Sequence, residues 1–210
     1  MGKIKNIVFD LGGVIMNLNV PKTIEEFERL GITNIINRTG HHYTDSVFYD
    51  FEIGKVSEFE FIEKLRKMSS LQPSSEEIQN AWNAMILNMP QERIECLINL
   101  KEKYNIYLLS NTNSIHQKKF LNEVNKENNF SFNNLFIKAY YSHELGIRKP
   151  DEKVFRFVLK DSNLNAEETL FIDDSIDNIR VAEKAGIKGC YFINGNLERN
   201  LEKYSICINH

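Results

Sequence analysis

The sequence is short of cysteine, of net charge and of long hydrophobic runs. Its net charge of −3 gives no basic excess of the kind that a nucleic acid or an anionic membrane surface requires. No hydrophobic run approaches the ~20 residues that span a bilayer. The chain also begins in a strand pattern rather than in a signal peptide. We therefore expect a cytoplasmic protein that binds neither membranes nor nucleic acids.

The three cysteines, Cys96, Cys190 and Cys207, are scattered, and no two of them form a Cys-x-x-Cys pair. An odd number without such pairing is typical of reduced, mostly buried thiols rather than of a disulfide framework. None of the three lies in a recognisable nucleophile pattern, so we expect no catalytic cysteine.

The composition is otherwise that of a globular protein. Of the 210 residues, 42% are hydrophobic and 26% are charged, which suits one domain with an insert or two small domains. We find no internal repeat and no low-complexity segment. The order of the local patterns therefore decides the architecture.

The stretch that follows the first strand is helical in pattern. One helix is predicted from Pro21, because proline is favoured in a first turn and acidic residues follow it. A second helix follows Ser57, whose spacing to Glu60 forms a capping box. A third begins at Ser75. Because no convincing strand pattern occurs here, we predict an inserted helical cap over residues 18–89.

Two further features of the predicted cap are aromatic. Residues 41–51 are aromatic and polar without clean periodicity, so they predict no regular element. Elsewhere, aromatic side chains recur at spacings that are typical of a small hydrophobic core. The residues expected to form this core are Phe27, Phe48, Phe51, Phe59, Phe61 and Trp82.

From residue 91 onward, the pattern alternates between helices and strands. Helices are predicted over 91–103, 114–126 and 150–159 and again up to 184, and strands over 106–110, 136–140, 169–174 and 189–193. Repeated strand–helix units imply parallel strands with right-handed crossovers. We therefore predict an α/β fold with a doubly wound, Rossmann-like parallel sheet, built from residues 1–17 and 90–210.

The first strand ends in an acidic residue and two glycines. The apolar run from Ile4 to Phe9 leads directly to Asp10, and Gly12 and Gly13 follow. Ligands of open α/β sheets bind at the carboxyl ends of the strands, and glycine lets the backbone come close to a ligand or ion. For this stretch alone, an Asp10 that only caps the next segment stays open as an alternative.

Polar groups also follow three later strands. These groups are Ser110-Asn111-Thr112-Asn113, Lys149-Pro150 and Asp173-Asp174-Ser175. Since the carboxyl ends of parallel strands meet at one edge of a sheet, we expect all of them to converge with Asp10. Their convergence in one chain is hard to explain as four unrelated caps.

The converging groups suit phosphate chemistry. Asp10 and Asp174 are hard oxygen donors of the kind that Mg²⁺ takes together with a substrate phosphate. Ser110 and the backbone N–H groups after it can hold phosphate oxygens. Lys149 offers a compact positive charge, and a carboxylate nucleophile can form an aspartyl-phosphate. Without a cation nearby, Asp173 beside the other two acids would raise carboxyl pKa values.

Taken in order and spacing, these motifs resemble motifs one to four of the haloacid dehalogenase superfamily. The stretches concerned are Asp10-Leu11-Gly12-Gly13-Val14, Ser110-Asn111-Thr112-Asn113, Lys149-Pro150 and Asp173-Asp174-Ser175-Ile176-Asp177-Asn178. The resemblance covers essentially the whole chain. It is strongest to small phosphatase-like members with a helical cap inserted after the first motif.

The resemblance implies a role for each matching residue. Asp10 is the nucleophile and a Mg²⁺ ligand, and the backbone carbonyl of Gly12 and the carboxylate of Asp174 complete the protein's metal contacts. Ser110 and Asn111 are implied to contact the phosphate. Lys149 is implied to stabilise its charge, and whether Asp173 binds the metal directly stays open. The implied substrate is a small phosphomonoester, such as a sugar phosphate; no oligomeric state is indicated.

One position departs from the resemblance. Phosphatases of this superfamily usually carry a second aspartate two residues after the nucleophile, where this chain has Gly12. That aspartate acts as general acid and base, a function typically worth ~10²–10⁴-fold in rate. Possible substitutes are His41, His42, Tyr43 and His116, although we expect these to be structural or surface residues.

Three interpretations follow from the glycine. In the first, the chain is a Mg²⁺-dependent phosphatase in which water or another side chain does the work of the missing acid. In the second, it is a metal-independent 2-haloacid dehalogenase, but that branch is implied to carry serines in place of Asp173 and Asp174. In the third, it is a catalytically weak or silent relative that acts as a binding module.

Overall fold

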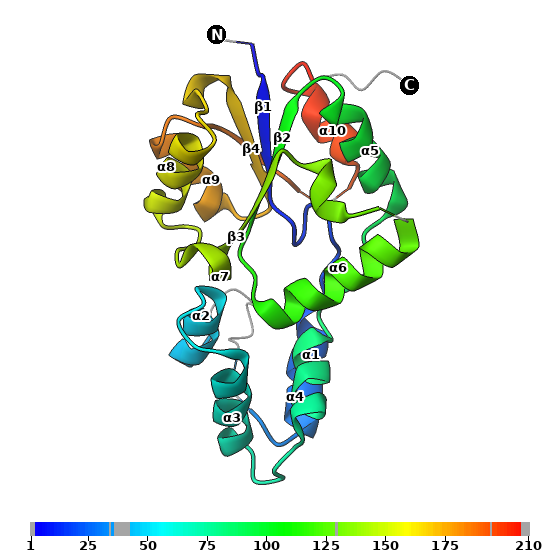
Figure 1. Ribbon diagram of the computed structural model, residues 1–210, viewed down its shortest axis with the longest axis vertical. Helices are drawn as coiled ribbons and strands as arrows, with labels where there is room; N and C mark the ends of the chain where they lie inside the picture. Colours follow the sequence, from blue (N-terminus) through cyan, green and yellow to red (C-terminus); the bar gives the residue numbers. More distant parts are fainter. Residues whose placement is uncertain (1–2, 34, 36–42, 129, 194, 207–210) are drawn as a thin grey trace.

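The computed structural model describes the whole chain except residues 1–2, 34, 36–42, 129, 194 and 207–210. Its centre is a five-stranded parallel sheet with the strand order β3-β2-β1-β4-β5 (Figure 1). The strands are β1 (Asn6–Phe9), β2 (Asn105–Ser110), β3 (Lys138–Tyr141), β4 (Thr169–Asp173) and β5 (Lys188–Tyr191). The predicted α/β fold with a doubly wound parallel sheet is confirmed.

The sheet is buried on both faces, as its apolar strands predict. Side chains of successive residues point to opposite faces of a strand. Ile7 and Phe9 of β1 therefore join one hydrophobic core, and Val8 joins the other. Helices α5, α6 and α10 cover the first face, and α8 and α9 cover the second (Figure 1).

Four helices around the sheet were predicted, with boundaries that differ by a few residues. They are α5 (Gln91–Lys101), α6 (Ser114–Asn128), α8 (Glu152–Asp161) and α9 (Ile176–Lys184). Helices α7 (Ser142–Leu145) and α10 (Leu197–Glu202) and short 3₁₀ turns at Phe132–Leu135 and Ala166–Glu168 were not predicted. Gly186 ends α9 with a φ of +86°, a conformation that favours glycine.

Among the described residues, helices α1 to α4 lie together below the sheet, and we refer to this group as the cap (Figure 1). They are α1 (Val20–Arg29), α2 (Ser46–Glu52), α3 (Glu58–Met68) and α4 (Ser75–Asn83). The capping box of Ser57 and Glu60 is present, and Ser74 and Glu77 form a second one. The division of the chain into two domains at residues 18 and 89 stays a prediction.

Two details of the cap differ from expectation. Helix α2 lies in the segment for which no element was predicted, although its buried residues, Val47, Phe48, Phe51 and Glu52, recur at a helical spacing. Phe59 was expected in the core of the cap but is 72% exposed, so that part of the prediction is wrong. The other five aromatic side chains predicted for the core are buried. His41 and His42 lie outside the described residues.

Two antiparallel segments connect the cap to the sheet. The N–H of Asn17 donates to the carbonyl of Asn88 (3.0 Å), and the N–H of Leu87 donates to the carbonyl of Asn17 (3.1 Å). The N–H of Asn19 donates to the carbonyl of Met85 (2.8 Å). These paired segments form a narrow hinge between the cap and the sheet.

The cap also contacts α7, through Gly54 in the turn between α2 and α3. Gly54 has a φ of +67°, and a Cβ at this position would overlap the backbone carbonyl oxygen of His143 in α7. A glycine is therefore required both by the backbone conformation and by the close approach of α7.

Among the described helices, none is long and apolar enough to cross a membrane.

The contact of Gly54 with α7 predicts different outcomes for two glycine substitutions. Gly186→Ala meets only ordinary contacts, so it should cost ~1–2 kcal/mol of unfolding free energy through its positive φ. Gly54→Ala has the same backbone cost and also forces the turn away from α7. We expect Gly54→Ala alone to accelerate amide exchange at Gly146, whose N–H closes α7. Urea unfolding and hydrogen exchange check this, and equal exchange in both variants would contradict the docking contact.

Candidate active site

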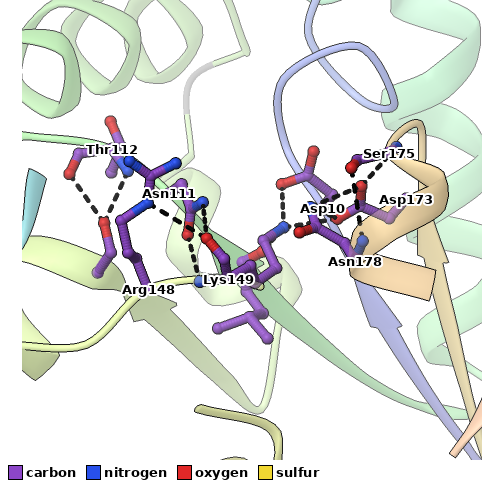
Figure 2. Close-up of polar contacts among 10 residues, drawn as sticks. Asp10, Asn111, Thr112, Arg148, Lys149, Asp173, Ser175 and Asn178 are labelled. Carbon is purple, nitrogen blue, oxygen red and sulfur yellow. Dashed lines mark hydrogen bonds and ion pairs between the residues drawn. The ribbon is translucent and has the colours of Figure 1, made fainter. Parts of the chain in front are cut away.

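The polar groups predicted at the strand ends converge at the carboxyl edge of the sheet, facing the cap. Figure 2 shows Asp10 after β1, Asp173 at the end of β4 and Lys149 from the loop after α7. The exposed fractions of these residues are 8%, 0% and 1%, respectively. Three ionisable side chains that are distant in sequence are thus buried together.

The ammonium group of Lys149 is the centre of the cluster. It donates to Oδ1 of Asp10 (2.6 Å), to Oδ2 of Asp173 (2.8 Å) and to the backbone carbonyl of Leu109 (2.8 Å). Burial by itself would lower the pKa of Lys149, but the two carboxylates outweigh this effect and raise the pKa above its ordinary value. Lys149 is therefore a fixed positive charge at neutral pH.

Asp173 is held by protein donors on both of its carboxylate oxygens. Its Oδ1 accepts from the N–H of Ser175 (2.7 Å), and the amide of Asn178 donates to both oxygens (3.0 Å each). Ser175 and Asn178 lie at the start of α9, so the first turn of this helix fixes the carboxylate. The Oδ2 atom of Asp173 also accepts from the Lys149 ammonium group. Asp173 therefore anchors the ammonium group.

Asp10, Asp173 and Asp174 form an acidic group whose ligand oxygens lie within 4.8 Å of one another. Asp174 is exposed, and its carboxylate lies where a Cβ at residue 13 would project. Gly13, with a φ of +78°, leaves room for it. Burial raises the pKa of Asp10 to about 7; Lys149 opposes this, and Asp173 and Asp174 add to it. Clustered carboxylate oxygens of this kind fit a hard divalent cation such as Mg²⁺.

The residues after β2 line the next part of the edge. Ser110 ends the strand and is buried. The side chain of Asn111 points to the backbone of Lys149: its amide donates to the Lys149 carbonyl (2.8 Å), and its Oδ1 accepts from the Lys149 N–H (2.9 Å). We call this pair of bonds the Asn111 clasp. The phosphate contact implied for Asn111 therefore falls to its backbone N–H, and it stays a prediction.

A second pair of hydrogen bonds holds the loop after β2, and it was not predicted from the sequence. We call it the Ser142 brace. The hydroxyl of Ser142 accepts from the N–H of Thr112 (2.9 Å) and donates to the carbonyl of Thr112 (3.0 Å). Ser142 is the first residue of α7 and directly follows β3. A polar residue immediately after a strand was the available signal. The brace connects the loop after β2 to the end of β3.

His116 and Tyr43, the two candidate substitutes for the missing acid that lie among the described residues, are engaged elsewhere. His116 is buried; its Nδ1 accepts from Asn113 (3.2 Å) and its Nε2 donates to the carbonyl of Trp82 (3.0 Å). The hydroxyl of Tyr43 donates to Oε1 of Glu52 (2.7 Å), and burial raises the pKa of Tyr43. Both residues hold the cap, as expected of structural residues.

Position 12 is itself crowded. A Cβ at Gly12 would lie 2.7 Å from Cδ1 of Leu18, in the hinge segment. An aspartate at this position would require Leu18 to move. Neither His116 nor Tyr43 therefore replaces the acid that Gly12 lacks.

A family model described as haloacid dehalogenase-like hydrolase matches residues 4–186 of the chain. Among characterised proteins, the chain is 32% identical to a D-ribitol-5-phosphate phosphatase of Bacteroides thetaiotaomicron, over 88% of this chain and 90% of the relative. It is 29% identical to a sesquiterpene phosphatase of Aspergillus oryzae, over 89% of each protein.

Solved structures show the same architecture. An enzyme of the HAD family from Bacteroides thetaiotaomicron, solved in complex with magnesium and inorganic phosphate, superposes with a TM-score of 0.84 at 35% identity, over 91% of this chain and 96% of that one. A HAD-like hydrolase from Porphyromonas gingivalis superposes with a TM-score of 0.84 at 29% identity, over 97% of each chain.

The burial of His116 predicts a pH dependence of stability. Burial lowers the pKa of His116 to about 4, so below its ordinary pKa of 6.5 the unfolded chain takes up a proton that the folded chain refuses. This residue should therefore cost ~2 kcal/mol of unfolding free energy between pH 7 and pH 5. Urea unfolding of wild type and His116→Gln at both pH values isolates this loss. An NMR titration of His116 with a pKa near 6.5 would contradict it.

Proposed function

The chain belongs to the haloacid dehalogenase-like hydrolase family, and we propose that it is a Mg²⁺-dependent phosphatase acting on a small phosphomonoester. The observation that carries the proposal is the buried Lys149 ammonium between Asp10 and Asp173, with Asp174 beside them. The fixed positive charge suits a phosphate oxygen, and the acidic group suits a cation.

The relative that acts on D-ribitol 5-phosphate supports a narrower proposal. Its similarity extends over 88% of this chain, including both the sheet and the cap. We therefore propose a phosphorylated sugar or sugar alcohol as the substrate, with a pentitol 5-phosphate as the first candidate. The small, polar character of such a substrate agrees with a site built from charged groups at the sheet edge.

In the proposed mechanism, a carboxylate oxygen of Asp10 forms a bond to phosphorus while the bond from phosphorus to the leaving oxygen breaks. The leaving oxygen departs with the electron pair and takes a proton from water, because Gly12 offers no acid. The Asp10 oxygen that does not accept from Lys149 is the one placed to attack. Lys149, Ser110 and the backbone N–H of Asn111 hold the phosphoryl oxygens. The resulting aspartyl-phosphate is then hydrolysed by water, and Asp10 is regenerated.

The metal is proposed to bind to Asp10, Asp174 and the backbone carbonyl of Gly12. When bound, Mg²⁺ supplies positive charge that neutralises the phosphate and the acidic group. Asp173 is proposed to act through Lys149, because its oxygens already accept from Ser175 and Asn178. The cap is proposed to close over the edge and exclude water from the aspartyl-phosphate.

The two other interpretations fit the site less well. A metal-independent dehalogenase has no use for three carboxylates within 4.8 Å of one another. A pure binding module has no use for a nucleophile that shares a buried ammonium group with a second carboxylate. Both interpretations predict distinct outcomes in the experiment below.

The proposal is tested by phosphate release from a panel of pentitol, pentose and hexose phosphates, with farnesyl phosphate as an apolar comparison. We expect turnover that requires Mg²⁺ and falls at least ~10³-fold in Asp10→Asn. Gly13→Ala displaces Asp174, so it should raise the Mg²⁺ concentration for half-maximal rate by ~10–100-fold. Gly186→Ala, which is distant from the site, is the matched control.

Three outcomes would contradict the proposal. Halide release from a 2-haloacid without metal would establish the dehalogenase. Absence of phosphate release from every substrate, with Mg²⁺ still bound, would favour the binding module. A preference for farnesyl phosphate would retain the phosphatase but overturn the sugar or sugar-alcohol substrate.

A further inference from the structure

A second, partly buried ion pair connects the cap to the loop that carries Lys149. Glu52 at the end of α2 pairs with Arg148 at 2.6 Å, and their side chains are 8% and 24% exposed. The hydroxyl of Tyr43 donates to the other oxygen of Glu52 (2.7 Å). The Arg148 guanidinium lies over the ring of Tyr49, 4.8 Å from its centroid. Two cap residues, Glu52 and Tyr49, therefore contact Arg148, and Tyr43 holds Glu52.

Arg148 also contacts the backbone of its neighbour. Its Nε donates to the carbonyl oxygen of Lys149 (3.2 Å), the same oxygen that accepts from the amide of Asn111 (2.8 Å). Figure 2 shows Arg148 and Asn111 on either side of this carbonyl. A continuous set of contacts thus runs from Glu52 through Arg148 to the Asn111 clasp and to the residue whose ammonium group meets Asp10.

A buried ion pair rarely adds stability, because removing both charges from water costs about as much as their attraction returns. Such a pair is therefore expected only when other groups hold both side chains in place. For Arg148 and Glu52 these groups are Tyr43 and Tyr49, which belong to the cap segment, so the pair requires a docked cap. When the cap moves away, Glu52 and Arg148 are hydrated separately, and the carbonyl of Lys149 loses one of its two side-chain donors.

We propose that Glu52 and Arg148 are positioning residues that couple docking of the cap to the placement of Lys149. The inference rests on the proposed function in one respect, namely that Lys149 holds the phosphoryl oxygens. Glu52 acts on Arg148, and Arg148 acts on the Lys149 backbone; neither needs to contact the substrate. A cap docked on the sheet edge then completes the catalytic site as well as covering it.

The chain offers a matched control at a second ionic contact between the cap and the sheet layer. Oε2 of Glu58, the first residue of α3, accepts from the Lys118 ammonium (2.7 Å) and from the Ser114 hydroxyl (3.2 Å). Glu58 and Lys118 thus bridge α3 and α6, as Glu52 and Arg148 bridge α2 and the loop before Lys149. Among the described residues, no hydrogen bond connects the Glu58 group to Lys149.

The test compares wild type with Glu52→Gln, Arg148→Lys and Glu58→Gln. Gln keeps the size of Glu52 but removes its charge, whereas Lys keeps the charge of Arg148 but cannot bond Glu52 and the Lys149 carbonyl together. Amide exchange of Lys149, whose N–H donates to Asn111, is measured by NMR without substrate and corrected for intrinsic rates. kcat and KM are measured with Mg²⁺ and the best phosphomonoester.

Arg148→Lys loses the charged hydrogen bond to the Lys149 carbonyl, and Glu52→Gln loses the ionic contact that holds Arg148. We expect each substitution to accelerate exchange of the Lys149 amide and to lower kcat by roughly tenfold. Arg148→Lys should keep a KM near that of wild type, because its charge still docks the cap. Glu58→Gln should raise KM while the Lys149 amide and kcat stay within about twofold, since docking weakens without reaching the clasp.

The proposal is overturned if the Lys149 amide exchanges equally in all four proteins, or if Glu58→Gln accelerates it as much as Glu52→Gln does. It is also overturned if Arg148→Lys changes only KM. The exchange pattern does not depend on activity. The expected pattern in a protein that hydrolyses no phosphomonoester would therefore support the coupling and contradict the phosphatase.

Discussion

A single ammonium group, buried at the carboxyl edge of a parallel sheet, is the constraint on which the rest of the site depends. The Lys149 side chain is almost wholly removed from water, and such a charge is tolerated only when it is paired and fully hydrogen-bonded. Its three donors reach a carboxylate after β1, a carbonyl of β2 and a carboxylate of β4. One group therefore fixes three adjacent strand ends relative to one another.

The charge balance around this group explains why the site suits a divalent cation. Asp10, Asp173 and Asp174 bring three formal negative charges, and Lys149 brings one positive charge, so 3 − 1 leaves two negative charges. The carboxylate oxygens of Asp173 accept hydrogen bonds from Lys149 and from the start of α9. Asp10 and Asp174 are therefore the two acids that we propose as metal ligands. The different parts proposed for Asp173 and for the other two acids follow from the protein donors that hold the Asp173 carboxylate.

Much of this arrangement was predictable because it depends on local sequence. Apolar strand runs and the polar groups that end them placed Asp10, Ser110, Lys149 and Asp173 at one edge. The parallel sheet and the capping box of α3 follow from equally local patterns. Local patterns suffice here because apolar strand runs and helix starts depend on residues that are close in sequence, whereas the strand order was not predicted.

What was not predictable depends on contacts between distant segments. The side chain of Asn111 binds the Lys149 backbone, 38 residues away, a contact that was not predicted. Helix α2 was missed although its buried residues recur at helical spacing, because one of them is the acid Glu52, which is buried through contacts with Tyr43 and Arg148. The pairing of Glu52 with Arg148 joins two segments that carry no mutual signal in the sequence. Each of these requires the folded chain before it can be recognised.

The most direct test of the central claim is a double-mutant cycle on unfolding free energy with Lys149→Met and Asp10→Asn. If Lys149 neutralises buried carboxylates, Lys149→Met alone should cost ~3–5 kcal/mol, because it leaves these charges uncompensated. Adding Asp10→Asn should then recover part of that loss, with a coupling energy above ~1 kcal/mol. Effects of the two substitutions that simply add, within ~0.5 kcal/mol, would contradict the account.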